Sequence, residues 1–205
     1  MKRIYLHGLG QTSVSWEKTI LHLNSAEFSV CPDLAEMIQG KDAVYENLYK
    51  EFSDLCDKLD DKIDICGLSL GGILALNYTI DHPEKINSLV LIAAQYKMPK
   101  LLLKIQNILF KFMPKSAFQQ TGFKKKEFIQ LCRSMMKLDF SSSINKITCP
   151  VLIVLGEKDR ANQKAAMHLT NILKNSRLQI INASGHEVNI EAPEKLADML
   201  RDFYK

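Results

Sequence analysis

"ICGLSLGGILAL", residues 65–76, places one serine among glycines between two apolar segments. Gly67, Ser69 and Gly71 match the pattern G-x-S-x-G, in which a serine stands at a sharp turn between a strand and a helix. The apolar residues on either side predict that strand and that helix. The hydroxyl of Ser69 would then lie at a helix N-terminus, where backbone N–H groups favour negative charge. An ordinary glycine turn is the alternative, so Ser69 is a candidate nucleophile that needs a base and an orienting group elsewhere in the chain.

The composition is that of a folded protein with a substantial core, with 205 residues, of which 46% are hydrophobic and 24% charged. The formal net charge of +4 is small and gives no indication of nucleic-acid binding. The five cysteines are scattered and form no CxxC pair, so we expect free, buried thiols rather than disulfides or a metal site. No apolar stretch approaches the ~18–20 residues of a membrane span, and no signal peptide is recognisable, so we expect a cytoplasmic protein.

Short apolar runs alternate with longer helical patterns along the chain. The runs are mostly continuous rather than alternating, which is typical of strands covered on both faces. Strands are predicted at residues 3–6, 28–31, 63–67, 88–93, 151–156 and 178–182, and helices at about 14–23, 41–59, 70–82, 161–174 and 191–204. This alternation predicts an α/β fold with a parallel sheet and right-handed crossovers.

Residues 97–147 interrupt this rhythm. They contain no convincing strand and two or three helical stretches, and they are too long for a simple crossover. We interpret them as a helical lid or cap inserted between the fourth and fifth strands.

Two polar residues beyond strand ends are candidate partners of Ser69. His186 follows the last predicted strand and Asp159 follows the fifth, so both belong to the edge of the sheet where ligands bind in open α/β folds. Taken alone, His186 could be an ordinary loop histidine and Asp159 a helix N-cap. Glu157 is a nearby rival for the acid, and the position within the motif favours Asp159. Together, Ser69, Asp159 and His186 give a nucleophile, an orienting acid and a base in one chain order.

The loop after the first strand, "LHGLGQTSVSW" at residues 6–16, is a candidate oxyanion loop. Its glycines allow the backbone to turn inward. We expect the N–H groups of Leu9 and Leu70 to stabilise negative charge on a carbonyl oxygen. His7 is expected to orient this loop by hydrogen bonding rather than to act as a base.

Five motifs, in order, resemble those of the α/β-hydrolase superfamily: HGLGQTSVSW, CPDL, GLSLGG, GEKD and SGHEVNIEAPEKL. They span the chain from residue 7 to near its end, apart from residues 97–147. The resemblance implies Ser69 as nucleophile, His186 as general base and Asp159 as its orienting acid. It also implies a doubly wound, mostly parallel six-stranded sheet of order 2-1-3-4-5-6, in a single domain over residues 1–205 with a small helical cap at about 97–147. Haloalkane and epoxide chemistry is not expected, because that chemistry uses aspartate as the nucleophile.

Residues 97–126 carry eight lysines and no acidic residue. On a helix, Lys97, Lys100, Lys104 and Lys111 would fall within about one sixth of the circumference. Apolar residues cover much of the remainder, including Leu101, Leu102, Ile105, Leu109 and Phe112. We expect a cap helix that buries its apolar side on the active site and exposes its lysines to water. The alternative is contact with anionic acyl substrates or with a lipid surface.

These features predict a serine hydrolase that cleaves small carboxylic esters or thioesters through an acyl-enzyme intermediate. No metal and no organic cofactor is expected to be needed. Two alternatives stay open. The same fold and residues could serve carbon–carbon hydrolysis or a lyase step, or the chain could be a non-enzymatic ligand-binding module. Fold alone does not decide the substrate.

Overall fold

The computed structural model describes residues 1–118 and 121–205, with the side chains of residues 101–106 outside this description. Its centre is a six-stranded sheet in the order β2-β1-β3-β4-β5-β6, and every neighbouring pair is parallel. The strands are β1 (Arg3–Leu6), β2 (Ser29–Val30), β3 (Ile63–Leu68), β4 (Ile86–Ile92), β5 (Val151–Gly156) and β6 (Ser176–Ile181). The predicted fold class and strand order are therefore confirmed.

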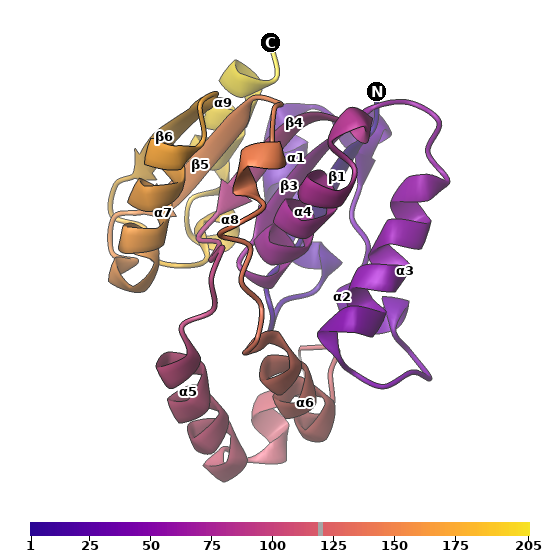
Figure 1. Ribbon diagram of the computed structural model, residues 1–205, viewed down its shortest axis with the longest axis vertical. Helices are drawn as coiled ribbons and strands as arrows, with labels where there is room; N and C mark the ends of the chain where they lie inside the picture. Colours follow the sequence, from indigo (N-terminus) through magenta and orange to yellow (C-terminus); the bar gives the residue numbers. More distant parts are fainter. Residues whose placement is uncertain (119–120) are drawn as a thin grey trace.

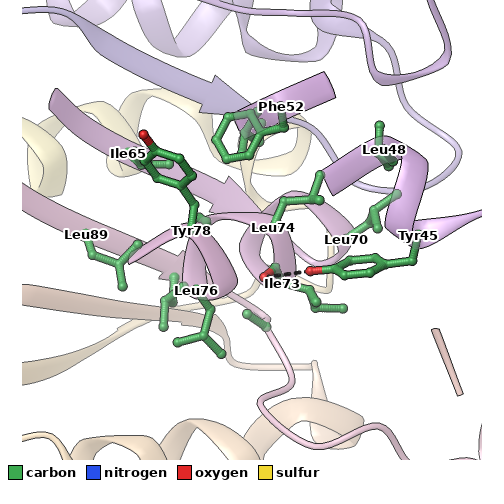
Figure 2. Close-up of a cluster of buried hydrophobic side chains, with 14 of the residues drawn as sticks. Tyr45, Leu48, Phe52, Ile65, Leu70, Ile73, Leu74, Leu76, Tyr78 and Leu89 are labelled. Atoms are coloured by element: carbon green, nitrogen blue, oxygen red, sulfur yellow. Dashed lines mark hydrogen bonds between the residues drawn. The ribbon is translucent and has the colours of Figure 1, made fainter. Parts of the chain in front are cut away.

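Helices cover both faces of this sheet (Figure 1). They include α1 (Glu17–Leu23), α3 (Tyr45–Asp57), α4 (Leu70–Asp81), α7 (Arg160–Ile172) and α9 (Pro193–Phe203). Side chains alternate along each strand, so Ile65 and Leu89 join α3, α4 and α7 in one buried cluster, while Cys66 and Val90 join α1 and α9 in the other. Figure 2 shows part of the first cluster, where Leu74 of α4 packs beneath Phe52 of α3.

Several predicted elements differ in their bounds, among them two helices and the edge strand. The predicted helix at 41–59 is shorter, and a separate helix, α2 (Leu34–Met37), precedes it. Asp33 begins α2 by accepting hydrogen bonds from Ala35 and Glu36, and Gly40, with a φ of +79°, lies in the turn before α3. The predicted helix at 191–204 is divided into α8 (Val188–Glu191) and α9, because Pro193 begins a new helix. The predicted strand at 28–31 is reduced to two residues.

The segment between β4 and β5 contains α5 (Lys100–Phe112), a short 3₁₀ helix at Lys115–Phe118 and α6 (Lys125–Met135). In Figure 1 it lies at the end of the sheet opposite both chain termini, which is the end where the parallel strands finish. A single antiparallel bridge between Lys97 and Asp139 closes its base. We call residues 97–147 the insert.

Aromatic and polar contacts give the insert its own packing. Phe110 of α5 contacts Phe118 and Phe128 edge to face. The hydroxyl of Ser134 on α6 accepts a hydrogen bond from the backbone N–H of Tyr45, at 2.8 Å, which ties α6 to the start of α3. Within residues 1–118 and 121–205, no helix has both the length and the apolar character to cross a membrane.

Candidate functional site

Ser69 lies at the sharp turn between β3 and α4. Its backbone has φ 52° and ψ −112°, a conformation that is costly for a residue with a side chain. A hydrogen bond from its N–H to the carbonyl of Ile92, at 2.9 Å, anchors the turn to the neighbouring strand. A Cβ at Gly67 would lie 2.2 Å from the carbonyl oxygen of Gly71, and one at Gly71 would lie 2.3 Å from that of Leu6. The two glycines of the motif are therefore required by close backbone contact.

His186 and Asp159 form a direct pair. Nδ1 of His186 lies 2.7 Å from Oδ2 of Asp159, although the residues are separated by 27 positions. Asp159 is 7% exposed and follows β5, whereas His186 is half-buried and follows β6. The hydrogen bond to Asp159 raises the pKa of His186 above its ordinary value, against the opposing effect of burial.

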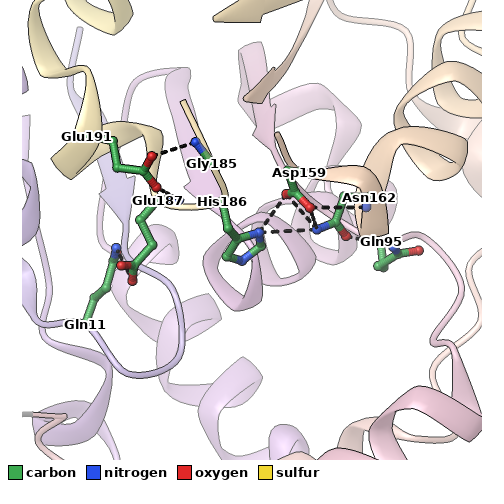
Figure 3. Close-up of polar contacts among 8 residues, drawn as sticks. All are labelled: Gln11, Gln95, Asp159, Asn162, Gly185, His186, Glu187 and Glu191. Carbon is green, nitrogen blue, oxygen red and sulfur yellow. Dashed lines mark hydrogen bonds and ion pairs between the residues drawn. The ribbon is translucent and has the colours of Figure 1, made fainter. Parts of the chain in front are cut away.

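The amide of Asn162 holds the carboxylate of Asp159 from the other side. Its Nδ2 lies 3.0 and 2.8 Å from the two carboxylate oxygens, and 3.2 Å from Nδ1 of His186 (Figure 3). Gln95 donates to Oδ1 of Asn162 at 2.7 Å and so fixes the direction of that amide. Burial alone would raise the pKa of Asp159, but the hydrogen bonds from His186 and Asn162 outweigh burial and lower it.

Sequence reasoning did not identify Asn162 or Gln95. The signal for Asn162 was its position three residues after Asp159 at the start of a predicted helix, where side chains three apart share a face. Glu157, the rival acid, has another role, because its carboxylate accepts a hydrogen bond from the backbone N–H of Ala183 at 2.7 Å. The structure thus pairs His186 with Asp159 and gives Glu157 a loop contact.

The loop after β1 passes beside Ser69. A Cβ built at Gly8 would lie 3.6 Å from Cβ of Ser69 and 2.7 Å from a methyl group of Leu68. Gly10 has a φ of +98°, a conformation that favours glycine. In the described part of the chain, the backbone N–H groups of Leu9 and Leu70 have no intramolecular acceptor. Neither N–H group is therefore satisfied within the described part of the chain.

His7 is fully buried and supports this loop. Its Nε2 accepts a hydrogen bond from the backbone N–H of Leu34 at 3.0 Å, and its Nδ1 lies 2.9 Å from the carbonyl oxygen of Gly8. Nδ1 must carry the proton, because Nε2 is an acceptor and a carbonyl can only accept. Burial lowers the pKa of His7, which favours this neutral form. The expected orienting role of His7 is consistent with these contacts.

A second set of contacts joins this loop to the loop that carries His186. Gln11 is buried, and its Nε2 lies 3.0 Å from Oε1 of Glu187 and 3.2 Å from Oδ1 of Asn189. Its Oε1 accepts from the N–H of Gly8 at 3.2 Å and from the amide of Asn189 at 3.1 Å. Figure 3 shows Gln11 directed toward Glu187. No sequence pattern pointed to this network.

The three predicted residues share one edge of the sheet. Strand register pairs Leu68 with Ile92, Ile92 with Val154 and Gly156 with Ile181, so β3, β5 and β6 end together. The structure joins Asp159 to His186 by a hydrogen bond, while the hydroxyl of Ser69 makes no hydrogen bond to any described residue. Across the described ranges, no group of three or more histidine, cysteine, aspartate or glutamate side chains is arranged to hold a metal ion.

Comparison with known proteins gives relatives across most of the chain. Mouse "Monoacylglycerol lipase ABHD6" is 26% identical over 161 residues, which cover 68% of this chain and 48% of that protein. This chain thus spans about half the length of that relative. A "Putative 2-succinyl-6-hydroxy-2,4-cyclohexadiene-1-carboxylate synthase" from Bacillus subtilis (strain 168) is 24% identical over 195 residues, covering 75% of this chain and 71% of the relative.

Solved structures show the same fold. A thermophilic esterase from Thermogutta terrifontis superimposes with a TM-score of 0.82 at 17% identity, covering 100% of this chain and 89% of that one. The family model described as "Alpha/beta hydrolase family" matches residues 4–199, which include Ser69, Asp159 and His186. This chain therefore belongs to the alpha/beta hydrolase family.

Proposed function

We propose that this chain is a serine hydrolase that cleaves small carboxylic esters or thioesters through an acyl-enzyme intermediate. The observation that carries the proposal is the 2.7 Å pair between His186 and Asp159, at the sheet edge where the strained turn presents Ser69. Support for ester chemistry comes from the relatives, which include a monoacylglycerol lipase, and from membership of the family.

In the proposed reaction, Nε2 of His186 takes the proton of the Ser69 hydroxyl as its oxygen attacks the substrate carbonyl. The tetrahedral intermediate collapses, and His186 returns the proton to the departing alcohol or thiol. Water then attacks the acyl-enzyme while His186 again takes a proton, and the acid is released with Ser69 restored. Asp159 stays ionised and holds the imidazole with Nδ1 protonated, so that Nε2 is the free base.

Negative charge on the substrate oxygen would be stabilised by the N–H groups of Leu9 and Leu70. Loss of one such donor costs an enzyme ~3–4 kcal/mol of transition-state stabilisation, as a general magnitude. The position of Gly8 beside Ser69 supports this assignment, because it brings the β1 loop close to the turn. Leu70 begins α4, so its N–H also carries the positive end of the helix dipole.

Labelling with a fluorophosphonate, followed by peptide mapping, tests the nucleophile without knowledge of the substrate. We expect one covalent adduct, on Ser69, in folded protein, and none in Ser69→Ala. Ser142→Ala is the matched control, because Ser142 is exposed in a turn of the insert, and it should label like the wild type. Folded wild-type protein without an adduct at Ser69 would refute the proposal.

A second candidate, a carbon–carbon hydrolysis or lyase reaction on the same residues, is favoured by one observation. A relative of similar coverage bears the name of a synthase rather than a hydrolase. A panel of short and long acyl esters separates the two, because a fluorophosphonate-reactive enzyme that turns over every ester slowly would favour this alternative. A ligand-binding module would turn over none of these esters, and Ser69→Ala would leave the measured background rate unchanged.

A further inference from the structure

The outer side of α5 exposes large apolar side chains to water. Phe112 is 85% exposed, Leu109 58% and Ile108 54%, with Met113 next to them at 38%. Phe110, one of their neighbours, instead points inward against Phe118 and Phe128. The apolar side of this helix is therefore not wholly buried, contrary to the expectation from sequence for Leu109 and Phe112. The side chains of Leu101, Leu102, Lys104 and Ile105 lie outside the described residues.

Cationic side chains lie beside this apolar surface. A hollow of ≈ 650 Å³ opens next to the C-terminal end of α5. Its basic lining residues are Lys111, Lys115, Lys125, Lys126 and Arg133, and Asp42 also lines it. Lys125 donates to the backbone carbonyls of Lys111 and Met113, which holds it at the end of the helix. Among described residues, Lys111, Lys115 and Lys126 form no ion pair with an acid.

We propose that this surface, formed by the apolar residues 108, 109, 112 and 113 and the basic hollow, docks on an anionic phospholipid membrane. An acidic peptide without apolar side chains would complement the lysines but would leave an 85% exposed phenylalanine without an apolar partner. A bilayer supplies both surfaces within a few ångströms, since anionic headgroups lie directly above hydrocarbon. Phosphate groups would occupy the basic hollow while Phe112 and Leu109 enter the boundary of the acyl chains.

Co-sedimentation with vesicles tests this docking, and it does not depend on the proposed catalytic activity. Wild-type protein should sediment with vesicles of phosphatidylglycerol mixed with phosphatidylcholine, and remain in solution with phosphatidylcholine alone. Ser69→Ala should bind like the wild type, because Ser69 lies at the turn between β3 and α4 and not on α5. Phe112→Asp and the double variant Lys111→Glu, Lys115→Glu should each lower binding by about tenfold or more.

Matched controls use exposed residues away from the insert. Leu21, on α1, is 72% exposed, and Lys195, on α9, is also exposed. Leu21→Asp and Lys195→Glu should therefore bind like the wild type. In a Phe112→Trp variant, tryptophan emission should shift to shorter wavelength with anionic vesicles, while buried Trp16 contributes a constant signal.

Three outcomes would overturn the proposal. The first is no sedimentation with anionic vesicles. The second is sedimentation that Phe112→Asp leaves unchanged, since contact would then be charge alone. The third is retention on immobilised polyglutamate without vesicle binding, which would indicate an acidic protein as the partner.

Discussion

Replacement of Asn162 by alanine tests how the carboxylate of Asp159 is held. The variant removes the Nδ2 contacts at 3.0 and 2.8 Å while the backbone N–H of residue 162 stays in place, at 3.3 Å from Oδ1. A hydrogen bond to a charged group is worth about 1.5–3 kcal/mol, and each ~1.4 kcal/mol changes a rate tenfold. If the poorer orientation of Asp159 costs the transition state the equivalent of one such bond, the reaction of Ser69 should slow by roughly 10–100-fold.

The pH dependence of this variant separates positioning from loss of structure. Without the amide, the carboxylate of Asp159 accepts fewer hydrogen bonds, so it attracts the proton of His186 more strongly. The amide dipole also no longer opposes a positive imidazole. Both changes raise the pKa of His186. The pH below which activity is lost should therefore rise. The assay is the second-order rate of fluorophosphonate inactivation across pH, with urea unfolding to confirm a folded protein.

Asn171→Ala is the matched control, because Asn171 lies on the same helix, α7, but is exposed to water. It should react like the wild type at every pH. An Asn162→Ala protein that is folded, reacts within twofold of the wild type and keeps its pH dependence would refute the positioning role.

Three further predictions concern the serine turn and the base. Gly71→Ala should lower the free energy of unfolding by about 1–3 kcal/mol, measured in urea, because the new methyl would lie 2.3 Å from the carbonyl oxygen of Leu6. Ser69→Gly should raise the free energy of unfolding by about 1 kcal/mol, because glycine adopts φ 52° without strain. It should also abolish labelling, because the hydroxyl is gone. An unchanged or lower free energy of unfolding would contradict the strain at Ser69. The rate of inactivation by a fluorophosphonate should fall as the pH is lowered, with a midpoint above the ordinary pKa of histidine. The reason is that only the neutral imidazole accepts a proton and Asp159 raises the pKa of His186. Asp159→Asn should move that midpoint to lower pH.

The sheet could be predicted from sequence because its strands are continuous apolar runs, and runs covered by helices on both faces have few alternative structures. The short edge strand at 29–30 and the divided helix near Pro193 were less predictable, because their bounds depend on tertiary contacts. The pairing of Asp159 with His186 followed from the positions of both residues beyond strand ends.

The supporting amides could not be predicted in the same way. Gln11 and Asn189 are separated by 178 positions, and although each lies within one of the quoted motifs, nothing in either motif indicates that their side chains meet. Their contact depends on how two loops meet at the sheet edge, which is a property of the assembled fold. Likewise, the sequence of α5 showed an amphipathic helix but not which of its apolar residues face inward.

The contact of Gln11 with Glu187 and Asn189 has a consequence for the order in which the protein folds. These bonds join the loop after the first strand to the loop after the last, so Gln11 lacks these two partners until residues near 189 have been synthesised and folded. Such long-range closure is costly in chain entropy and belongs late in folding. A ribosome-bound fragment that ends before β6 would therefore hold the serine turn without the loop that carries His186, and its Gln11 would lack both Glu187 and Asn189.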